Sequence, residues 1–143
     1  MKVENLRSPY AKTDGLFYFP RMLDKIRLFA AGQLPKDYHA NLGGGFDERC
    51  LHFLGVDYDV LKERVSGGGS DEEILEWAFA TGHRRNEEEI EIWNEFMRKR
   101  GWNDEGSERL QSRLQEAGFA NRTDIQTFFD FIDLDEGREK ARR

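Results

Sequence analysis

The sequence contains a single cysteine, Cys50, and no long hydrophobic run. One cysteine cannot form a disulfide within the chain, so nothing in the composition points to an oxidising compartment. No segment approaches the roughly 20 apolar residues that a membrane-spanning helix needs. The opening residues, MKVENLRSPYAK, also lack the apolar core of a signal peptide. We therefore expect a cytoplasmic protein that has no membrane partner.

A surplus of positive charge is also absent, because 28 aspartates and glutamates outnumber 22 lysines and arginines and give a net charge of −6. Such a chain lacks the basic surface that neutralises nucleic-acid phosphates, so we expect no nucleic-acid partner. One local exception is the ending GREKARR, which we interpret as a solvated basic tail over residues 137–143. The cations of this tail are Arg138, Lys140, Arg142 and Arg143.

What the sequence does contain is apolar material for a core and clear signals for helix ends. Hydrophobic residues make up 38% of the chain and aromatic residues 13%, which suits one domain over residues 1–143. In PRMLDKIRLFAAG, Pro20 suits a first helical turn and Gly32 suits the position after a last turn. The helical period gathers an apolar arc made of Met22, Leu23, Ile26, Phe29 and Ala30. The same period leaves a solvent side made of Arg21, Asp24, Lys25, Arg27 and Leu28.

Further short helices are predicted over residues 47–54, 58–65, 71–82, 87–101, 107–118 and 124–137. Three of them begin with residue pairs that suit a capping box, namely Ser70 with Glu73, Asn86 with Glu89, and Thr123 with Gln126. The stretch SGGGS at 66–70 is interpreted as a turn between helices, because helix signals adjoin it on both sides. The sequence thus predicts an all-α fold, a compact orthogonal array of about seven short helices with an extended N-terminal segment over residues 1–19.

The stretch YHANLGGGFDERCLHFLG, residues 38–55, holds two histidines and the cysteine, which raises the question of a Cys–His site. On a helix over residues 47–54, Cys50 and His52 point about 200° apart, so we predict an inward cysteine, an outward histidine and no dyad. His39, Cys50, His52 and His83 are too scattered for a metal-ligand pattern, so we expect no metal and no cofactor. The glycine runs at 43–45 and 67–69 match neither phosphate-binding pattern and are interpreted as turns.

Two basic clusters remain as candidates for a binding site, one on the helix after Pro20 and one at His83, Arg84 and Arg85. In the plainer interpretation the first cluster is solvated and the second complements the dipole of the preceding helix. In the other, the two clusters converge with the 38–49 loop into a pocket for a carboxylate or phosphate, anions that arginine binds through paired hydrogen bonds. The candidate ligand-binding residues are Arg21, Lys25, His39, Asn41, Arg49 and Arg84.

Several phrases also carry a family resemblance, namely LRSPYAKTDGLFYFPRMLDKIRLFAAGQL, GVDYDVLKERV, ILEWAF, EIWNEFM and RTDIQTFFDFIDLDEG. In this order they resemble a family of small bacterial proteins described as a domain of unknown function. The resemblance covers residues 6–137 and implies a bacterial, stand-alone, intracellular protein. It implies no catalytic residue, cofactor or activity.

For function, we expect a small intracellular binding or regulatory module for a protein partner or a small acidic ligand. The alternative is a small enzyme or anion-binding domain, with a site formed by the 38–49 loop and the basic face of the first helix. Oligomeric state, and whether the protein is an enzyme, are left open by the sequence. A protein-binding module predicts an exposed apolar patch on the order of a few hundred Å². The alternative predicts a deep pocket on which polar groups converge.

Overall fold

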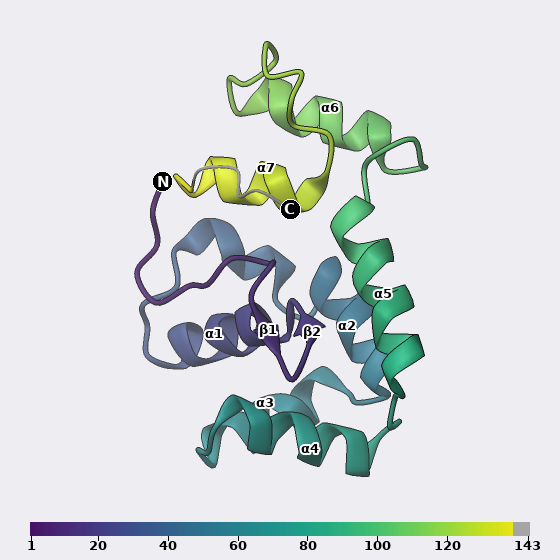
Figure 1. Ribbon diagram of the computed structural model, residues 1–143. Coiled ribbons are helices and arrows are strands. Elements are labelled where there is room, and N and C mark those ends of the chain that lie inside the picture. The colour runs from purple at the N-terminus through teal and green to yellow at the C-terminus, as the bar shows by residue number, and fades with distance from the viewer. Residues whose placement is uncertain (139–143) are drawn as a thin grey trace.

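A two-stranded hairpin precedes the first helix. In the structure, a computed structural model that describes residues 1–138 (Figure 1), β1 (Lys12–Thr13) pairs antiparallel with β2 (Leu16–Phe17). Asp14 and Gly15 form the turn with φ of 47° and 84°, as expected for an Asp-Gly hairpin turn. The strands lie within the predicted extended segment. Residues 139–143, which include Lys140, Arg142 and Arg143 of the predicted tail, lie outside the described residues.

The other regular elements of residues 1–138 are all helices, which confirms the prediction of an all-α fold of about seven short helices. The elements in chain order are α1 (Phe19–Ala30), the 3₁₀ helix η1 (Lys36–Asn41), α2 (Phe46–Leu54), α3 (Tyr58–Ser66), α4 (Asp71–Thr81), α5 (Glu87–Lys99), α6 (Ser107–Glu116) and α7 (Phe128–Asp135).

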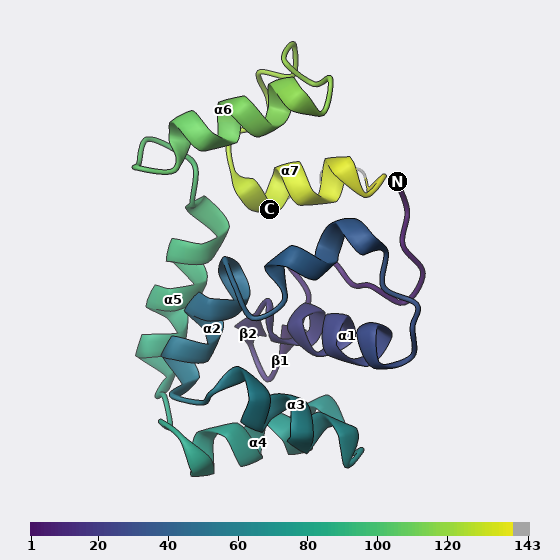
Figure 2. The same cartoon turned by 180° about the vertical axis from the view of Figure 1, so that it is seen from behind.

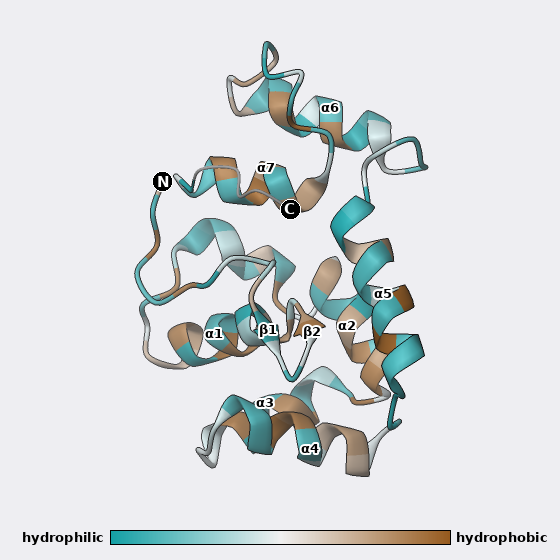
Figure 3. Cartoon of the chain, viewed as in Figure 1, coloured by the Kyte–Doolittle hydropathy of each residue, from teal (hydrophilic) through white to brown (hydrophobic). Residues whose placement is uncertain are grey.

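The helices form two pairs that flank a central group. α3 and α4 lie side by side at one end of the molecule, α6 and α7 lie at the other end, and α5 runs along one side between them (Figures 1 and 2). The hairpin, α1 and α2 occupy the middle. Figure 3 shows hydrophobic and hydrophilic residues on the same helices, as expected where each helix gives one face to a core. In residues 1–138 we find no helix long and apolar enough to cross a membrane.

Local capping signals place the starts of α4 and α5 correctly. Ser70 and Glu73 form the predicted capping box of α4. Asn86 and Glu89 form the predicted capping box of α5. SGGGS is the turn between α3 and α4, also as predicted. The predicted start at Thr123 is wrong: α7 begins at Phe128, and the Thr127 hydroxyl accepts the capping bond from the amide of Asp130 at 3.2 Å.

The physical reason for the later start of α7 lies in contacts outside that helix. The amide of Phe128 donates to the carbonyl of Arg100 at 2.9 Å, which fixes the chain at the end of α5. The preceding residues form turns, in which Arg122 pairs with Asp124 at 2.9 Å. Ile125 is nonetheless buried, in a cluster between α6 and α7. A threonine with a suitable residue three positions later therefore marks a possible cap, and tertiary contacts choose between candidates.

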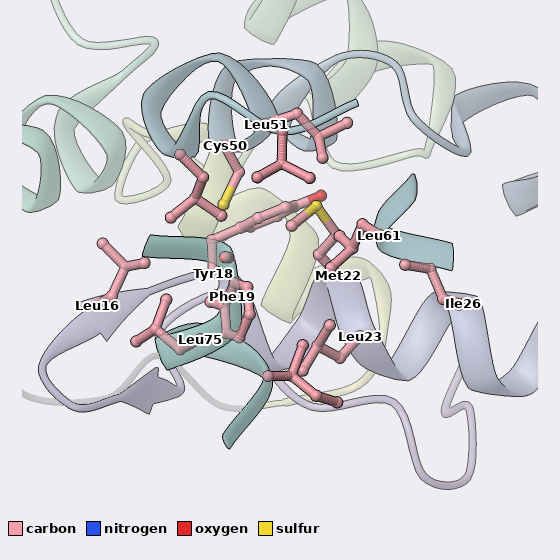
Figure 4. Close-up of a cluster of buried hydrophobic side chains, with 14 of the residues drawn as sticks. Leu16, Tyr18, Phe19, Met22, Leu23, Ile26, Cys50, Leu51, Leu61 and Leu75 are labelled. Carbon is pink, nitrogen blue, oxygen red and sulfur yellow. The ribbon is translucent and has the colours of Figure 1, made fainter. Parts of the chain in front are cut away.

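The central core joins α1 to α2, α3 and α4. Phe19, Met22 and Leu23 of α1 are fully buried, and Figure 4 shows the Tyr18 ring lying across this cluster beside Cys50 and Met22. The predicted inward position of the cysteine is confirmed, because its exposed fraction is 0%. Since burial and nearby Asp47 both raise the pKa of this thiol, it is a neutral core group rather than a nucleophile.

The apolar face of α1 is displaced from the predicted arc. Leu28, assigned to the solvent side, is buried against Val3, Leu6 and Leu34, because the N-terminal segment crosses that side of the helix. Phe29, assigned to the core, is 43% exposed and contacts the ring of His39 edge-on. The helical period alone cannot foresee a covering segment that has no periodic pattern of its own.

Candidate functional site

A cavity of about 960 Å³ lies between α1, the η1–α2 segment and the α6–α7 pair. Figure 2 shows these elements facing one another across the middle of the molecule. Four of the six candidate residues line this cavity, namely Arg21, Lys25, Asn41 and Arg49. The 38–49 loop and the basic side of the first helix are therefore adjacent in space.

The other two candidates lie elsewhere. Nε2 of His39 is 2.9 Å from the carbonyl oxygen of Leu34, so this histidine closes the loop after α1 instead of lining the cavity. Arg84 is exposed, forms an ion pair with Glu76 of α4, and lies 5.5 Å over the Phe79 ring. The second basic cluster thus stays on the α4–α5 connection and does not converge with the first.

The predicted solvent exposure of the polar side of α1 is wrong for three residues. Arg21, Asp24 and Lys25 are only 4%, 7% and 5% exposed. Asp24 accepts two hydrogen bonds of 2.9 Å from the Arg7 guanidinium, and acids from later elements meet the other two. Charged side chains can be buried in this way because each meets an opposite charge, and the sequence pattern of one helix does not show the partners.

One part of the cavity wall is an ion pair between α1 and the end of α7. Arg21 donates through Nη1 and Nη2 to the two carboxylate oxygens of Glu136, at 2.8 and 2.6 Å. Tyr38 donates to the same carboxylate at 2.8 Å. Burial alone would raise the pKa of Glu136, but the hydrogen bonds and charge of Arg21 outweigh it and hold this pKa below its ordinary value of 4.5.

Arg138 adds to the same ion pair, which corrects part of the predicted tail. Its guanidinium lies 2.5 Å from Glu136 and 3.1 Å from Asp133, and it donates to the carbonyl of Leu6. Arg138 is thus held by contacts with α7 and the N-terminal segment, because two acids and a carbonyl converge on it.

A second part of the wall is a buried group of three polar side chains. Nζ of Lys25 lies 2.8 Å from Oδ1 of Asp47 and 3.3 Å from the hydroxyl oxygen of Tyr18. The tyrosine donates to the same carboxylate oxygen at 2.6 Å, and the amide of Gly43 donates to Oδ2 at 3.0 Å. Burial lowers the pKa of Lys25 despite the opposing charge of Asp47, and burial raises the pKa of Tyr18.

The loop before α2 holds Asp47 in this position. Gly43 and Gly45 have φ of 73° and 56°, in the region that glycine adopts most readily, so the prediction that these glycines form a turn is confirmed. A Cβ at Gly43 would come within 3.0 Å of the Tyr58 ring. The turn therefore needs glycine both for its backbone and for its close approach to α3.

The backbone of Tyr18 is in an unusual conformation. With φ of 77° and ψ of −28°, this residue is left-handed at the junction of β2 and α1. Such a backbone costs a bulky residue about 1–3 kcal/mol and persists only where its surroundings hold it. The ring stacks on Phe129 at 6.1 Å, and the hydroxyl is fixed between Lys25 and Asp47. The strain coincides with the cavity wall.

Arginines dominate one end of the cavity. The guanidiniums of Arg49 and Arg100 lie 5.1 and 5.8 Å over the Phe96 ring, and Arg100 is 3.5 Å from Asp104. Arg109 and Arg113 lie one turn apart on α6, and both line the cavity. Within residues 1–138, Arg49, Arg109 and Arg113 have no ion-pair partner.

Acidic lining residues lie mostly at the opposite end. Asp37 belongs to η1 and Asp135 to the last turn of α7, beside the N-terminus in Figure 2. Glu48 lies on α2 next to Arg49. Among residues 1–138, no group of three or more histidine, cysteine or acidic side chains is placed to hold a metal ion. The cavity thus has a cationic end lined by arginines and an opposite end where Asp37 and Asp135 lie. The wall between them contains the ion pairs Arg21–Glu136 and Lys25–Asp47.

Residues 3–138 match the model of a family described as a domain of unknown function, DUF5069. The chain belongs to the DUF5069 family. A comparison with curated proteins finds no match.

In this DUF5069 chain, sequence reasoning missed the partners that give the cavity its chemistry. Tyr18, Asp47 and Glu136 are not among the candidate residues that the sequence predicts. A local signal existed only for Asp47, which follows a glycine turn on the predicted site loop. Nothing local marks Tyr18 or Glu136, because their partners come from other elements.

Proposed function

We propose that this DUF5069 protein binds a small anionic ligand, a carboxylate or phosphate, in the cavity between α1, η1–α2 and α6–α7. The observation that supports the proposal is the meeting of Arg21, Lys25, Asn41 and Arg49 at one cavity, joined by arginines of α6. The proposal keeps the single-domain organisation and the bacterial, cytoplasmic setting expected from the sequence.

The ligand's anionic group is placed at the cationic end. Arg21 and Lys25 are neutralised by Glu136 and Asp47, so they shape the wall more than they attract charge. Arg49, Arg109 and Arg113 have guanidinium donors to spare, and a guanidinium matches a carboxylate or phosphate through paired hydrogen bonds. In a chain with a net charge of −6, a local excess of arginine is a selective attraction for small anions.

A protein partner receives less support from the surface. The exposed large apolar side chains are spread over the N-terminus, α1, α3, α5 and the turn after α5; they are Met1, Phe29, Val60, Ile92, Phe96 and Trp102. One of them, Phe96, is covered on its face by two guanidiniums. The anion-binding alternative predicted a pocket on which polar groups converge, and the polar side chains gathered at this cavity are the reason that we favour it.

A thermal-shift experiment tests the proposal. We expect inorganic phosphate or citrate to raise the melting temperature above that in sodium chloride of equal ionic strength, because a ligand that binds only the folded state stabilises it. At a hundredfold excess over Kd the stabilisation is about 2.7 kcal/mol. The double variant Arg49→Ala/Arg113→Ala should lose this anion-dependent shift.

The matched control is Arg84→Ala, which removes an exposed arginine of the second cluster. This variant should keep the full shift. Equal melting temperatures of the wild-type protein in phosphate and in sodium chloride, with citrate and related carboxylates equally without effect, would contradict the proposal. A loss of the shift in Arg84→Ala as large as that in the double variant would also contradict it.

A further inference from the structure

Lys25 differs from the other lysines that the structure describes. Its side chain is only 6% exposed, whereas Lys2, Lys12, Lys36, Lys62 and Lys99 are all exposed. It nevertheless lines the cavity, as does Tyr18. Among residues 1–138 its ammonium group has two acceptors, Asp47 and Tyr18, which leaves its third N–H for the cavity.

Neutralising Asp47 does not by itself explain why Tyr18 is placed between this carboxylate and Lys25. The carboxylate already accepts from Tyr18 and from the amide of Gly43. The tyrosine hydroxyl reaches the lysine from a left-handed backbone, at the cost of strain described above. Burial lowers the pKa of Lys25, which increases the share of free amine at neutral pH. The amine of Lys25, the carboxylate of Asp47 and the hydroxyl of Tyr18 thus meet at the wall of the cavity. The same cavity is lined by arginine side chains.

We propose that the Nζ amine of Lys25 is a nucleophile that forms an imine with a small aldehyde or ketone bearing a carboxylate or phosphate. This inference rests on the proposed function, because the arginines of the cationic end hold the anionic group while the carbonyl carbon faces the lysine. The class of ligand is therefore narrowed from small anions to anionic carbonyl compounds.

The step balances with the groups at hand. Asp47 takes a proton from the ammonium group, and the free amine attacks the carbonyl carbon, so that a C–N bond forms and the π electron pair moves to oxygen. Tyr18 protonates that oxygen and regains a proton from the attacking nitrogen. The proton held by Asp47 then leaves with the hydroxyl as water when the C–O bond breaks. One ammonium group and one carbonyl give one protonated imine and one water, with no oxidant or reductant.

Reductive trapping of the wild-type protein tests the proposal. The protein is incubated with glyoxylate, a small anionic aldehyde, and sodium cyanoborohydride at pH 7, and the modified lysines are identified by peptide mass mapping. Positioned groups that transfer protons, as Asp47 and Tyr18 would here, speed such a step by about 10²–10⁴-fold. We expect Lys25 to be labelled at least about tenfold faster than Lys62, and this ratio to fall as the pH is raised towards 10. Labelling of Lys25 that is no faster than that of Lys62 overturns the proposal.

Added phosphate separates this inference from the proposed function. Phosphate should slow the labelling of Lys25 and leave Lys62 unchanged, since it competes for the arginines. A phosphate-dependent rise in melting temperature with no preferential labelling of Lys25 overturns the imine and leaves the anion site standing. Fast labelling that phosphate does not slow, in a protein that phosphate does not stabilise, overturns the anion site and with it the proposed ligand class.

A variant pair tests the role of the hydroxyl. Tyr18→Phe keeps Lys25 and Asp47 but removes the group that protonates the carbonyl oxygen, so labelling of Lys25 should slow by at least about tenfold. Tyr10→Phe is the matched control, because it removes a hydroxyl that donates to Asp130 at 2.7 Å and does not line the cavity. Equal labelling rates in the two variants overturn the assigned role of Tyr18. Should Tyr18→Phe not fold, the wild-type labelling ratio decides the proposal.

Discussion

The two basic clusters of this protein each contain an arginine paired with a glutamate, but the two pairs lie in opposite environments. On α1, Arg21 pairs with Glu136, which is 115 residues away in the chain, and both side chains are at most 5% exposed. On the α4–α5 connection, Arg84 pairs with Glu76 across eight residues, and both side chains are more than half exposed. The Arg21–Glu136 pair therefore forms only when distant elements pack together, whereas the Arg84–Glu76 pair joins residues that are close in the chain.

An arginine–glutamate ion pair therefore contributes differently to stability when it is buried and when it is exposed. An exposed ion pair is surrounded by water, so removing it changes little. A buried pair has lost its hydration, so removing one partner leaves an uncompensated charge and costs about 3–5 kcal/mol. The Arg21–Glu136 pair is therefore a structural part of the cavity wall. The Arg84–Glu76 pair lies on the surface and contributes little to stability.

Of the variants considered, Glu136→Gln should lower the free energy of unfolding the most. It keeps the shape of the side chain but removes the charge that meets Arg21, so we expect the free energy of unfolding to fall by about 3–5 kcal/mol. Urea denaturation measures this change. Glu76→Gln is the matched control and should leave the denaturation midpoint unchanged. Similar midpoints for the two variants would show that burial does not separate the two clusters.

Acid should narrow the difference in stability between the wild-type protein and Glu136→Gln. The folded state holds the pKa of Glu136 below 4.5, so the carboxylate's stabilising contribution is complete above pH 4.5 and is lost as the pH falls through the lowered value. Urea denaturation from pH 7 to pH 3 should show the gap between the two proteins narrowing below pH 4.5. A gap that stays constant or widens would contradict the assignment.

Tyr18→Phe should have a smaller effect on stability. The substitution leaves the ring in place and removes a hydroxyl that bonds Asp47 and Lys25, so these two buried groups each lose a partner. We expect the free energy of unfolding to fall by about 1–3 kcal/mol. Chemical denaturation measures it, and an unchanged midpoint would show that water replaces the hydroxyl at no cost.

Sequence reasoning succeeded where the deciding contacts are local. The starts of α4 and α5 follow from caps whose bonds span three residues, and Cys50 is inward because its neighbours on α2 share one helical face. It failed at Leu28, at the start of α7, and on the polar side of α1. In each case a distant segment supplies the covering residue, the hydrogen bond or the counter-charge.

The candidate site was predictable in part for the same reason. Asn41 at the end of η1 and Arg49 in α2 both lie within the 38–49 stretch that the sequence singled out, and Arg21 and Lys25 lie on the helix expected to face it. His39 and Arg84 are instead held by contacts close to them in the chain. The α6 arginines and Glu136 could not be found, since their contribution depends on how the last two helices are placed.

The pairing of Arg21 with Glu136 has a consequence for how the cavity arises during synthesis. A ribosome releases the N-terminal part of a chain first, and local contacts form before distant ones because loop closure is costly. The hairpin and α1 through α5 emerge well before α7, yet the guanidinium of Arg21 has no carboxylate until residue 136 arrives. In a nascent chain the wall that Arg21 and Glu136 form between α1 and α7 is therefore completed only after residue 136 has emerged.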